Sequence, residues 1–380
     1  MALPILTRDD FIATLRAGLA RGRARPYTDF SLAPLAAEPA RFALVVGAGF
    51  SAGVVPMVHE LLTRTIGDYY FPDQDQSSVE RPDDVRSSDS AAFWQEFNQA
   101  AVRIGEVALP LDHAGHPQSP GEAYQRLFAY RVVSAMFGGP GAPVTRGEHF
   151  LRGFLRYLLE PGSQAGHGST GRSALNDAHL YLAALLEAQQ SAHGWPLAPF
   201  CRTIFTTNFD TLLPTALQVM QLQARITDRP ERGIDAEDLQ APEGPVHLVY
   251  THGSILRYNP ASATTELDEL AARNVDVLYD YLRARDVLVV GYGGWGDSLM
   301  AALSRGGDAG RVVYWCGVGD APPASASTLA EQRGGGVCYI PLGRAGSDGL
   351  MRALYVGLVA DEGRVDPAER YRRWQELARR

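Results

Sequence analysis

The sequence predicts an α/β protein: a parallel sheet of six strands, with helices on both faces and an inserted helical module. Three observations lead to this prediction. Short continuous apolar runs alternate with helical patterns, which is typical of parallel sheets buried on both faces. Glycine turns follow two of these runs. Between the first run and the second lie about 155 residues that fit no strand–helix–strand spacing.

The chain begins with a short amphipathic helix and a linker. Residues 7–22 start with a capping-box-like pair, Thr7 and Asp10. Apolar residues recur at every fourth position of this segment, as Phe11, Leu15 and Leu19. A proline-bearing stretch follows, so we expect residues 1–40 to form an N-terminal helix and linker.

The apolar runs predict one Rossmann-like domain, formed by residues 41–71 and 196–345. Helical patterns such as Leu267–Arg285 and Asp348–Val359 separate most of the runs. Residues 346–380 are expected to form C-terminal helices. The six expected strands are Phe42–Val46, Arg202–Phe205, Val246–Tyr250, Asp286–Val290, Arg311–Cys316 and Val337–Pro341.

Residues 72–195 are expected to form a helical module inserted into that domain. Its first part, Pro72–Ser90, is acidic, rich in serine and free of aromatic residues, which favours a solvated loop. Four helical patterns follow the loop, and the third has a clear apolar face. They are Ala91–Gly105, Gly121–Phe137, Arg146–Glu160 and Leu175–His193.

Composition excludes several classes of function. The formal charge of −8 argues against direct nucleic-acid binding, which needs a basic surface. All 35 basic residues are arginine, so a P-loop lysine and Schiff-base chemistry are excluded. The three cysteines lie far apart, which indicates no structural metal and a reducing cytoplasm. No segment suits a signal peptide or a membrane span. A short cluster, Asp112-His113 with His116, has no third metal ligand and favours a surface loop.

The segment "LVVGAGFSAGVVP", residues 44–56, joins the first strand to a glycine turn. Gly47, Gly49 and Ala52 satisfy the loose dinucleotide-binding fingerprint G-x-G-x-x-G/A, although a turn built only for tight packing has the same letters. A dehydrogenase would place an acidic residue at the end of a second strand. Asp68 has the spacing but lies in a helical pattern. A simple dehydrogenase is therefore not expected.

Three further polar segments follow expected strands, where parallel α/β sheets place their ligands. Thr206–Asp210 carries four polar side chains, more than the one that a helix cap requires. His252 follows the third strand, and "GYGGWGDSL", residues 291–299, follows the fourth. Tyr292 and Trp295 suit either stacking on adenine or core packing.

These motifs resemble the sirtuin family, in the family's order, over about residues 41–342. They are Gly47-Ala48-Gly49-Phe50-Ser51 with Pro56, Thr206 to Asp210, His252-Gly253, and Gly291-Tyr292-Gly293. The resemblance implies NAD as the ligand, with Asn208 and His252 as the catalytic pair. The residues expected to bind NAD are Gly47, Ala48, Gly49, Ser51, Pro56, Thr207, Asp210, Gly291, Tyr292, Gly293 and Asp297.

The chain departs from the protein-deacylating sirtuins at two points. It cannot build their four-cysteine zinc module, and Met57–Glu60 stands where they carry Pro-Asp-Phe-Arg. These departures look like the bacterial sirtuin-like effectors of antiphage defence, such as those of the Thoeris and HerA-associated systems. The resemblance implies an NAD⁺ glycohydrolase that depletes NAD. Two alternatives stay open: a zinc-free deacylase or ADP-ribosyltransferase, and a catalytically silent sensor or scaffold that binds NAD or ADP-ribose.

The chemistry needs few residues, because nicotinamide leaves a cationic ring as a neutral molecule. No acid has to protonate it, so the carboxylate pair of ordinary glycosidases is unnecessary. An asparagine can orient a water and a ribose hydroxyl, and a histidine can accept a proton near neutral pH. Backbone N–H groups from Gly47 to Ser51 would hold the pyrophosphate. Asp210 and Asp297 suit either ribose hydroxyls or helix caps.

An NAD-depleting enzyme needs control, so we expect a homo-oligomer that is activated by assembly or by a partner such as a HerA-type ATPase. The Pro72–Ser90 segment could cover the site. Tyr371, Trp374 and Leu377 form a stripe among arginines near the C-terminus, which is typical of interfaces. The same stripe also suits packing on its own domain.

Overall fold

The computed structural model describes most of the chain and divides it into two compact units. The first unit comprises residues 1–51, 175–257 and 265–380, and the second comprises residues 52–174 and 258–264. The described residues are 3–22, 42–55, 57–70, 83–128, 131–141, 143, 147, 149–154, 175–190, 199–228, 234, 239, 245–252, 264–294, 297–306, 311–359 and 365–378.

The first unit is built on one parallel sheet, which confirms the predicted α/β class. The described part of the sheet has seven strands rather than six, in the order β3-β4-β2-β1-β5-β6-β7. Without β3, this is the strand order of a Rossmann fold. The strands are β1 Phe42–Val46, β2 Cys201–Thr206, β3 Ala224–Thr227, β4 Val246–Tyr250, β5 Asp286–Val290, β6 Val313–Gly317 and β7 Val337–Pro341.

The prediction of six strands was wrong because β3 has no apolar run. Ala224–Thr227 pairs with β4 along only one side in the described sheet, and Ile226 is 39% exposed. By contrast β1 lies in the middle of the sheet, between β2 and β5, and all five of its residues are buried. Phe42, Leu44 and Val46 pack in one hydrophobic cluster, while Ala43 and Val45 pack in another. Burial on both faces therefore explains the continuous apolar run.

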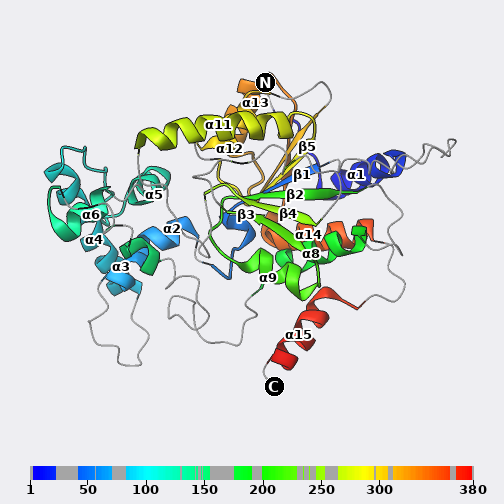
Figure 1. The fold of residues 1–380 in the computed structure, drawn as a ribbon, viewed down its shortest axis with the longest axis horizontal. Coiled ribbons are helices and arrows are strands. Elements are labelled where there is room, and N and C mark those ends of the chain that lie inside the picture. The colour runs from blue at the N-terminus through cyan, green and yellow to red at the C-terminus, as the bar shows by residue number, and fades with distance from the viewer. Residues whose placement is uncertain are drawn as a thin grey trace. The chain divides into compact units, whose positions relative to one another are not determined.

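Helices cover both faces of the sheet (Figure 1), as the sequence predicted. Leu213 and Leu354 belong to the cluster on one face, and Leu278 and Leu329 to the cluster on the other. On the first face lie α1 Arg8–Gly22, α8 Asp177–Gln190, α9 Leu212–Val219 and α14 Gly346–Leu358. On the other lie α11 Thr264–Leu282, α12 Ser298–Ser304 and α13 Ala324–Arg333.

Helix α1 begins as its sequence indicates. The Thr7 hydroxyl donates to Asp10 Oδ2 at 2.6 Å, and the Asp10 N–H donates to Thr7 Oγ1 at 3.1 Å. Phe11, Leu15 and Leu19 are buried in the first cluster. None of the helices in the described part of the chain is long and apolar enough to cross a membrane.

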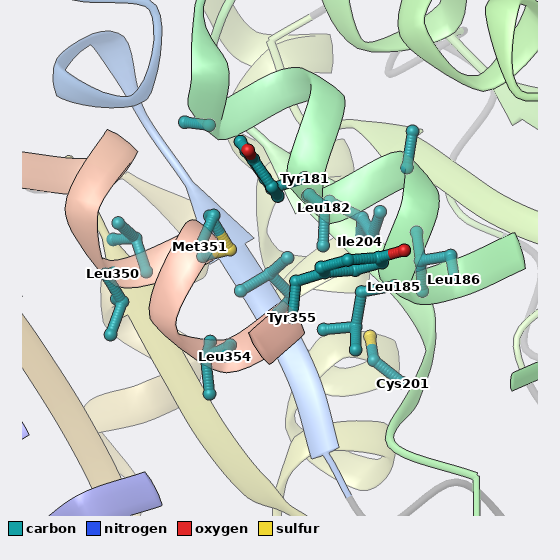
Figure 2. Close-up of a cluster of buried hydrophobic side chains, with 14 of the residues drawn as sticks. Tyr181, Leu182, Leu185, Leu186, Cys201, Ile204, Leu350, Met351, Leu354 and Tyr355 are labelled. Carbon is teal, nitrogen blue, oxygen red and sulfur yellow. The ribbon is translucent and has the colours of Figure 1, made fainter. Parts of the chain in front are cut away.

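Helices α8 and α14 pack together over the central strands (Figure 2). Leu182 and Leu185 of α8 face Met351 and Tyr355 of α14, and Ile204 of β2 lies beneath them. Helix α8 was expected in the inserted module, within residues 72–195. It belongs instead to the sheet-containing unit, because its many buried side chains complete the core on this face.

The second unit is helical and has an aromatic core. Phe93 and Phe97 are buried there with Trp94, whose Nε1–H donates to Leu62 O at 2.7 Å. Phe150 stacks on Phe93 with their ring centroids 6.2 Å apart. Its described elements are α2 Val58–Glu60, a π-helical turn Leu61–Thr65, α3 Ile66–Tyr70, α4 Asp83–Arg103, α5 Pro120–Phe128 and α6 Arg131–Gly138.

One expectation for this region needs correction. The predicted loop Pro72–Ser90 is helical from Asp83 onward, because α4 begins eight residues before the predicted helix, and its residues 72–82 lie outside the described residues. The expected helix Gly121–Phe137 corresponds to α5 and α6, and residues 129–130 between them lie outside the described residues.

The remaining short elements complete the chain. After β7, a 3-10 turn leads into α14, and the C-terminal helix packs on the first unit through Tyr371, which is buried. Trp374 and Leu377 of the same helix are 38% and 70% exposed. These elements are η1 Ala48–Phe50, η5 Gly343–Ala345 and α15 Pro367–Ala378.

Candidate functional site

Two glycine turns meet at the carboxyl edge of the sheet, between β1 and β5. The chain continues from β1 to β2 on one side and reaches β5 on the other, so this is the topological switch point where such sheets bind ligands. Gly47 donates its N–H to Val290 O at 3.1 Å, and Gly49 donates to Gly291 O at 2.9 Å. A Cβ atom on Gly47 would lie 2.6 Å from Gly291 O, closer than two atoms tolerate. The close approach of two backbones therefore requires glycine here.

The first turn has few N–H groups left for a phosphate. Besides those of Gly47 and Gly49, the N–H of Phe50 donates to Gly47 O and that of Ser51 to Ala48 O. Residues Ala48–Phe50 form a single 3-10 turn, and no α-helix begins directly after it. None of these four hydrogen bonds uses the N–H of Ala48. The pyrophosphate contact expected from Gly47–Ser51 would therefore fall on that N–H.

Ser51, at the end of this turn, contacts two residues of the segment after β2. Ser51 Oγ lies at hydrogen-bond distance from Asp210 Oδ2, 2.8 Å away, and Asn208 Nδ2 donates to Ser51 Oγ at 3.0 Å. Asp210 Oδ1 accepts the N–H of Leu212, at the start of α9. Burial raises the pKa of Asp210, against the lowering effects of Ser51, Leu212 and Asn208. Three of the predicted site residues are thus joined by hydrogen bonds.

A histidine that the sequence did not single out completes this group. His179 Nε2, on α8, lies 3.3 Å from Ser51 Oγ. On its other side, His179 Nδ1 contacts Asn176 Oδ1, and Asn176 Nδ2 donates to Phe50 O at 2.8 Å. Burial lowers the pKa of His179 to about 3, so the ring is neutral. We call Asn176, His179, Ser51, Asn208 and Asp210 the Ser51 cluster.

His252 follows β4 and pairs with Asp297. His252 Nε2 lies 3.1 Å from Asp297 Oδ2, with side-chain exposures of 26% and 12%. Asp297 Oδ1 accepts the Tyr292 hydroxyl at 2.6 Å and the Met300 N–H at 2.9 Å, which caps α12. The carboxylate is thus both a helix cap and a partner of His252, and both of its oxygens already accept bonds from the protein.

The carboxyl ends of β2 and β4 are tied together beside these groups. Thr251 donates its N–H to Thr206 O at 2.9 Å, and the rings of Phe209 and His252 lie 6.4 Å apart. Strands β4 and β5 are three positions apart in the sheet, which is roughly 14 Å. The His252–Asp297 contact therefore reaches across the ends of β2 and β1, where the Ser51 cluster lies.

The remaining predicted site residues differ in their burial and contacts, and some lie outside the described residues. Thr207 donates its N–H to Val46 O at 3.1 Å, and Gly293 is exposed. Tyr292 is buried, and its ring lies 5.9 Å from that of Trp315, which fits the core-packing alternative. Pro56, Gly253 and Trp295 lie outside the described residues.

In the described part of the chain, no group of three His, Cys, Asp or Glu side chains could hold a metal ion. At the Asp112 loop, the Oδ1 atom accepts the N–H groups of Ala114 and His116, which is ordinary turn geometry.

The comparisons with known proteins leave this geometry as the basis for a functional argument. No protein-family model matches the chain, and no curated protein matches it significantly.

Proposed function

We propose that this protein is an NAD⁺ glycohydrolase, which converts NAD⁺ and water to nicotinamide, ADP-ribose and a proton. The observation that carries the proposal is the pairing of two polar groups after the neighbouring strands β4 and β2. His252 is held by Asp297, and Asn208 is held by Ser51. Both pairs lie at the switch point of a Rossmann-like sheet, where a dinucleotide fits the strand order.

His252 is arranged to act as a base through one particular nitrogen. A carboxylate can only accept hydrogen bonds, so the contact with Asp297 needs a proton on His252 Nε2. The neutral ring then carries its lone pair on Nδ1. In this proposal Nδ1 takes a proton from the attacking water or a ribose hydroxyl, and Asp297 stabilises the resulting cation.

Asn208 is suited to orient the substrate. Its Nδ2 donates to Ser51, and its backbone N–H donates to Thr206 Oγ1 at 3.1 Å, so the residue is fixed at two points. The amide oxygen is then the group that can accept a hydrogen bond from a ribose hydroxyl or the water. Such fixed geometry lowers the entropic part of the barrier.

In this proposal the enzyme is an NAD-depleting effector of antiphage defence, as the resemblance to sirtuin-like effectors implies. Its activity would rise on self-assembly or on joining a partner such as a HerA-type ATPase. A deacylase or ADP-ribosyltransferase would use the same two residues but another acceptor. A silent sensor would bind NAD without breaking it.

Nicotinamide release from NAD⁺, followed by chromatography, tests the proposal. Purified protein should release nicotinamide and ADP-ribose in equal amounts. Asn208→Ala and His252→Ala should each lower the rate by roughly 10²-fold or more, because each removes a group that acts on the reacting atoms. Asn208→Asp is a sharper variant, since it keeps the shape and removes the Nδ2 donor.

His113→Ala is the matched control, because His113 is exposed in the second unit and should leave the rate unchanged. Equal melting temperatures would show that the variants fold. A folded His252→Ala protein with full turnover would overturn the assignment. Binding of NAD without nicotinamide release would favour the sensor, and release only with an acyl-peptide or a protein acceptor would favour the transferases.

A further inference from the structure

If Asp210 is ionised, the Ser51 cluster has one hydrogen-bond donor too few for its buried acceptors. Asn176 fixes the starting point: its Nδ2 donates to Phe50 O, and its Oδ1 accepts the backbone N–H of His179 at 3.1 Å. A flipped amide would set donor against donor and acceptor against acceptor, so Oδ1 faces His179 Nδ1. Since Oδ1 can only accept, Nδ1 must carry the ring proton.

The neutral ring of His179 then presents a bare lone pair to Ser51. His179 is 1% exposed and packs edge-on against Phe50, with ring centroids 5.0 Å apart, so the ring is shielded from bulk solvent. Its Nε2 needs a donor, and the atom at 3.3 Å is Ser51 Oγ. The Ser51 hydroxyl has one hydrogen, however, and Asp210 Oδ2 lies closer, at 2.8 Å.

With a neutral His179 ring, this arrangement has two protonation states. With an ionised Asp210, Ser51 donates to the carboxylate, and its lone pair opposes that of His179, which leaves a buried acceptor unsatisfied. With a protonated Asp210, the carboxyl donates to Ser51, Ser51 donates to His179, and Asn208 Nδ2 fills the second lone pair of Ser51. The second state satisfies every group and avoids a buried charge.

Hydrogen bonds from Ser51, Leu212 and Asn208 favour the charged form of Asp210, but burial has the larger effect and raises its pKa. Tyr250, on β4, directs its hydroxyl to the main-chain oxygen of Asp210 at 2.7 Å rather than to the carboxyl group. The Leu212 N–H meets Oδ1, which remains an acceptor in either state. No arginine forms an ion pair with Asp210 among the described residues.

We propose that His179 is a positioning residue of the site, which holds a proton on Asp210 through Ser51 and fixes the Ser51 hydroxyl to which the Asn208 amide is bound. The proton on Asp210 Oδ2 points to Ser51 Oγ, and the chain of donors runs from Asp210 through Ser51 to His179. Asn208 donates its Nδ2 to Ser51 Oγ in either state, so a fixed Ser51 holds the amide in place with its oxygen directed away from Ser51. The role of His179 in catalysis rests on the proposed NAD⁺ cleavage. The protonation of Asp210 is independent of that proposal.

Infrared difference spectroscopy tests the proton directly. The spectrum of the wild type minus that of Asp210→Asn should contain the band of a protonated carboxyl group at neutral pH. In His179→Gln the Gln oxygen replaces Nε2 as acceptor, so the band should remain. In His179→Leu the acceptor is lost, and the band should titrate away about 1 to 2 pH units lower.

Absence of the band from wild-type protein at neutral pH would overturn the proposal, and this measurement needs no variant at position 179. An unchanged titration in a folded His179→Leu protein would overturn it as well. If that variant does not fold, Ser51→Ala, which removes a single oxygen atom, replaces it, and its band should also move to lower pH.

Nicotinamide release supplies the second readout. His179→Leu should lower kcat by roughly 10²-fold with a smaller change in KM, because a misplaced Asn208 costs orientation rather than binding. His179→Gln should recover most of the rate. Equal losses in both variants would show a merely structural role. If the wild type releases no nicotinamide, the proposed function fails, while the infrared band still decides the state of Asp210.

Discussion

At the scale of single residues, Gly47 is constrained by the backbone of the second glycine turn. Gly47→Ala should destabilise the protein by about 1–3 kcal/mol, because the new Cβ meets Gly291 O and Tyr292 Cα, both at 2.6 Å, and neither can move aside. Urea denaturation measures the free energy of unfolding. Gly319→Ala is the matched control, since its Cβ would lie 3.5 Å from the nearest atom. Equal effects of the two substitutions would contradict the close approach of the turns.

His179 and Asp210 should affect the pH dependence of stability in opposite directions. The folded pKa of His179 is about 3 against an ordinary 6.5, so below pH 6.5 the unfolded chain takes up a proton that the folded chain refuses. Stability from His179 is therefore lost as the pH falls from 6.5 toward 3. The folded pKa of Asp210 is raised above 3.8, so its contribution is lost as the pH rises above 3.8. In the wild type the two effects partly cancel.

Asp210→Asn should expose the contribution of His179. The free energy of unfolding should rise more steeply with pH in this variant than in the wild type between about pH 4 and 6.5, by at most ~1.4 kcal/mol per pH unit. Urea denaturation across this range measures the slopes. Asp320→Asn, in an exposed turn, should leave the wild-type slope unchanged. Parallel profiles for Asp210→Asn and the wild type would contradict the opposed pKa shifts.

The sequence could predict Ser51, Asn208 and Asp210 as site residues because they follow strands, and in the structure they share hydrogen bonds. His179 could not be found in this way. It lies in an apolar helix, where a lone histidine suggests core packing, and its contact with Ser51 spans 128 residues of chain. Such long-range contacts depend on tertiary packing, which local patterns do not encode.

At the scale of elements, the α8–α14 contact is the main support of one face of the sheet. Leu354→Ala should destabilise the protein by about 2–5 kcal/mol, because the Leu354 side chain is fully buried and its loss leaves a cavity. Val356→Ala lies two residues away on the same helix and is the control, since Val356 is 69% exposed. Denaturant midpoints compare the two. A small effect at Leu354 would show that this face tolerates a cavity.

Strands buried on both faces were predicted well, since continuous apolar runs leave few alternatives. Strand β3 was missed because an edge strand of four residues with Ile226 exposed has no such run. The sequence did not predict the first turns of α4, because the composition of Asp83–Ser90 is typical of a solvated loop. In the structure these turns are continuous with the part of α4 that buries Phe93.

At the scale of the whole molecule, helix α15 is where we expect copies of the chain to meet. Tyr371 is buried in its own unit, which agrees with packing there, while Trp374 stacks beside it and Leu377 stays exposed. Leu377→Ser should therefore reduce an oligomer toward the monomer without changing the melting temperature. Light scattering after gel filtration measures the mass. Val356→Ser, on another exposed helix position, should leave the mass unchanged; a monomeric wild type would contradict the prediction.

The strand order also constrains how the chain folds during its synthesis. Strand β1 ends at residue 46, and its first partner, β2, begins at residue 201, which is 201 − 46 = 155 residues later. At ~5–20 residues per second, a ribosome needs roughly 8 to 31 s to supply that partner. Meanwhile residues 52–174, the larger part of the second unit, are synthesised, but β1 has no neighbour on either side, since β5 comes later still. The most apolar strand of the nascent chain thus waits the longest, and chaperones that hold extended apolar segments should associate with the chain in this interval.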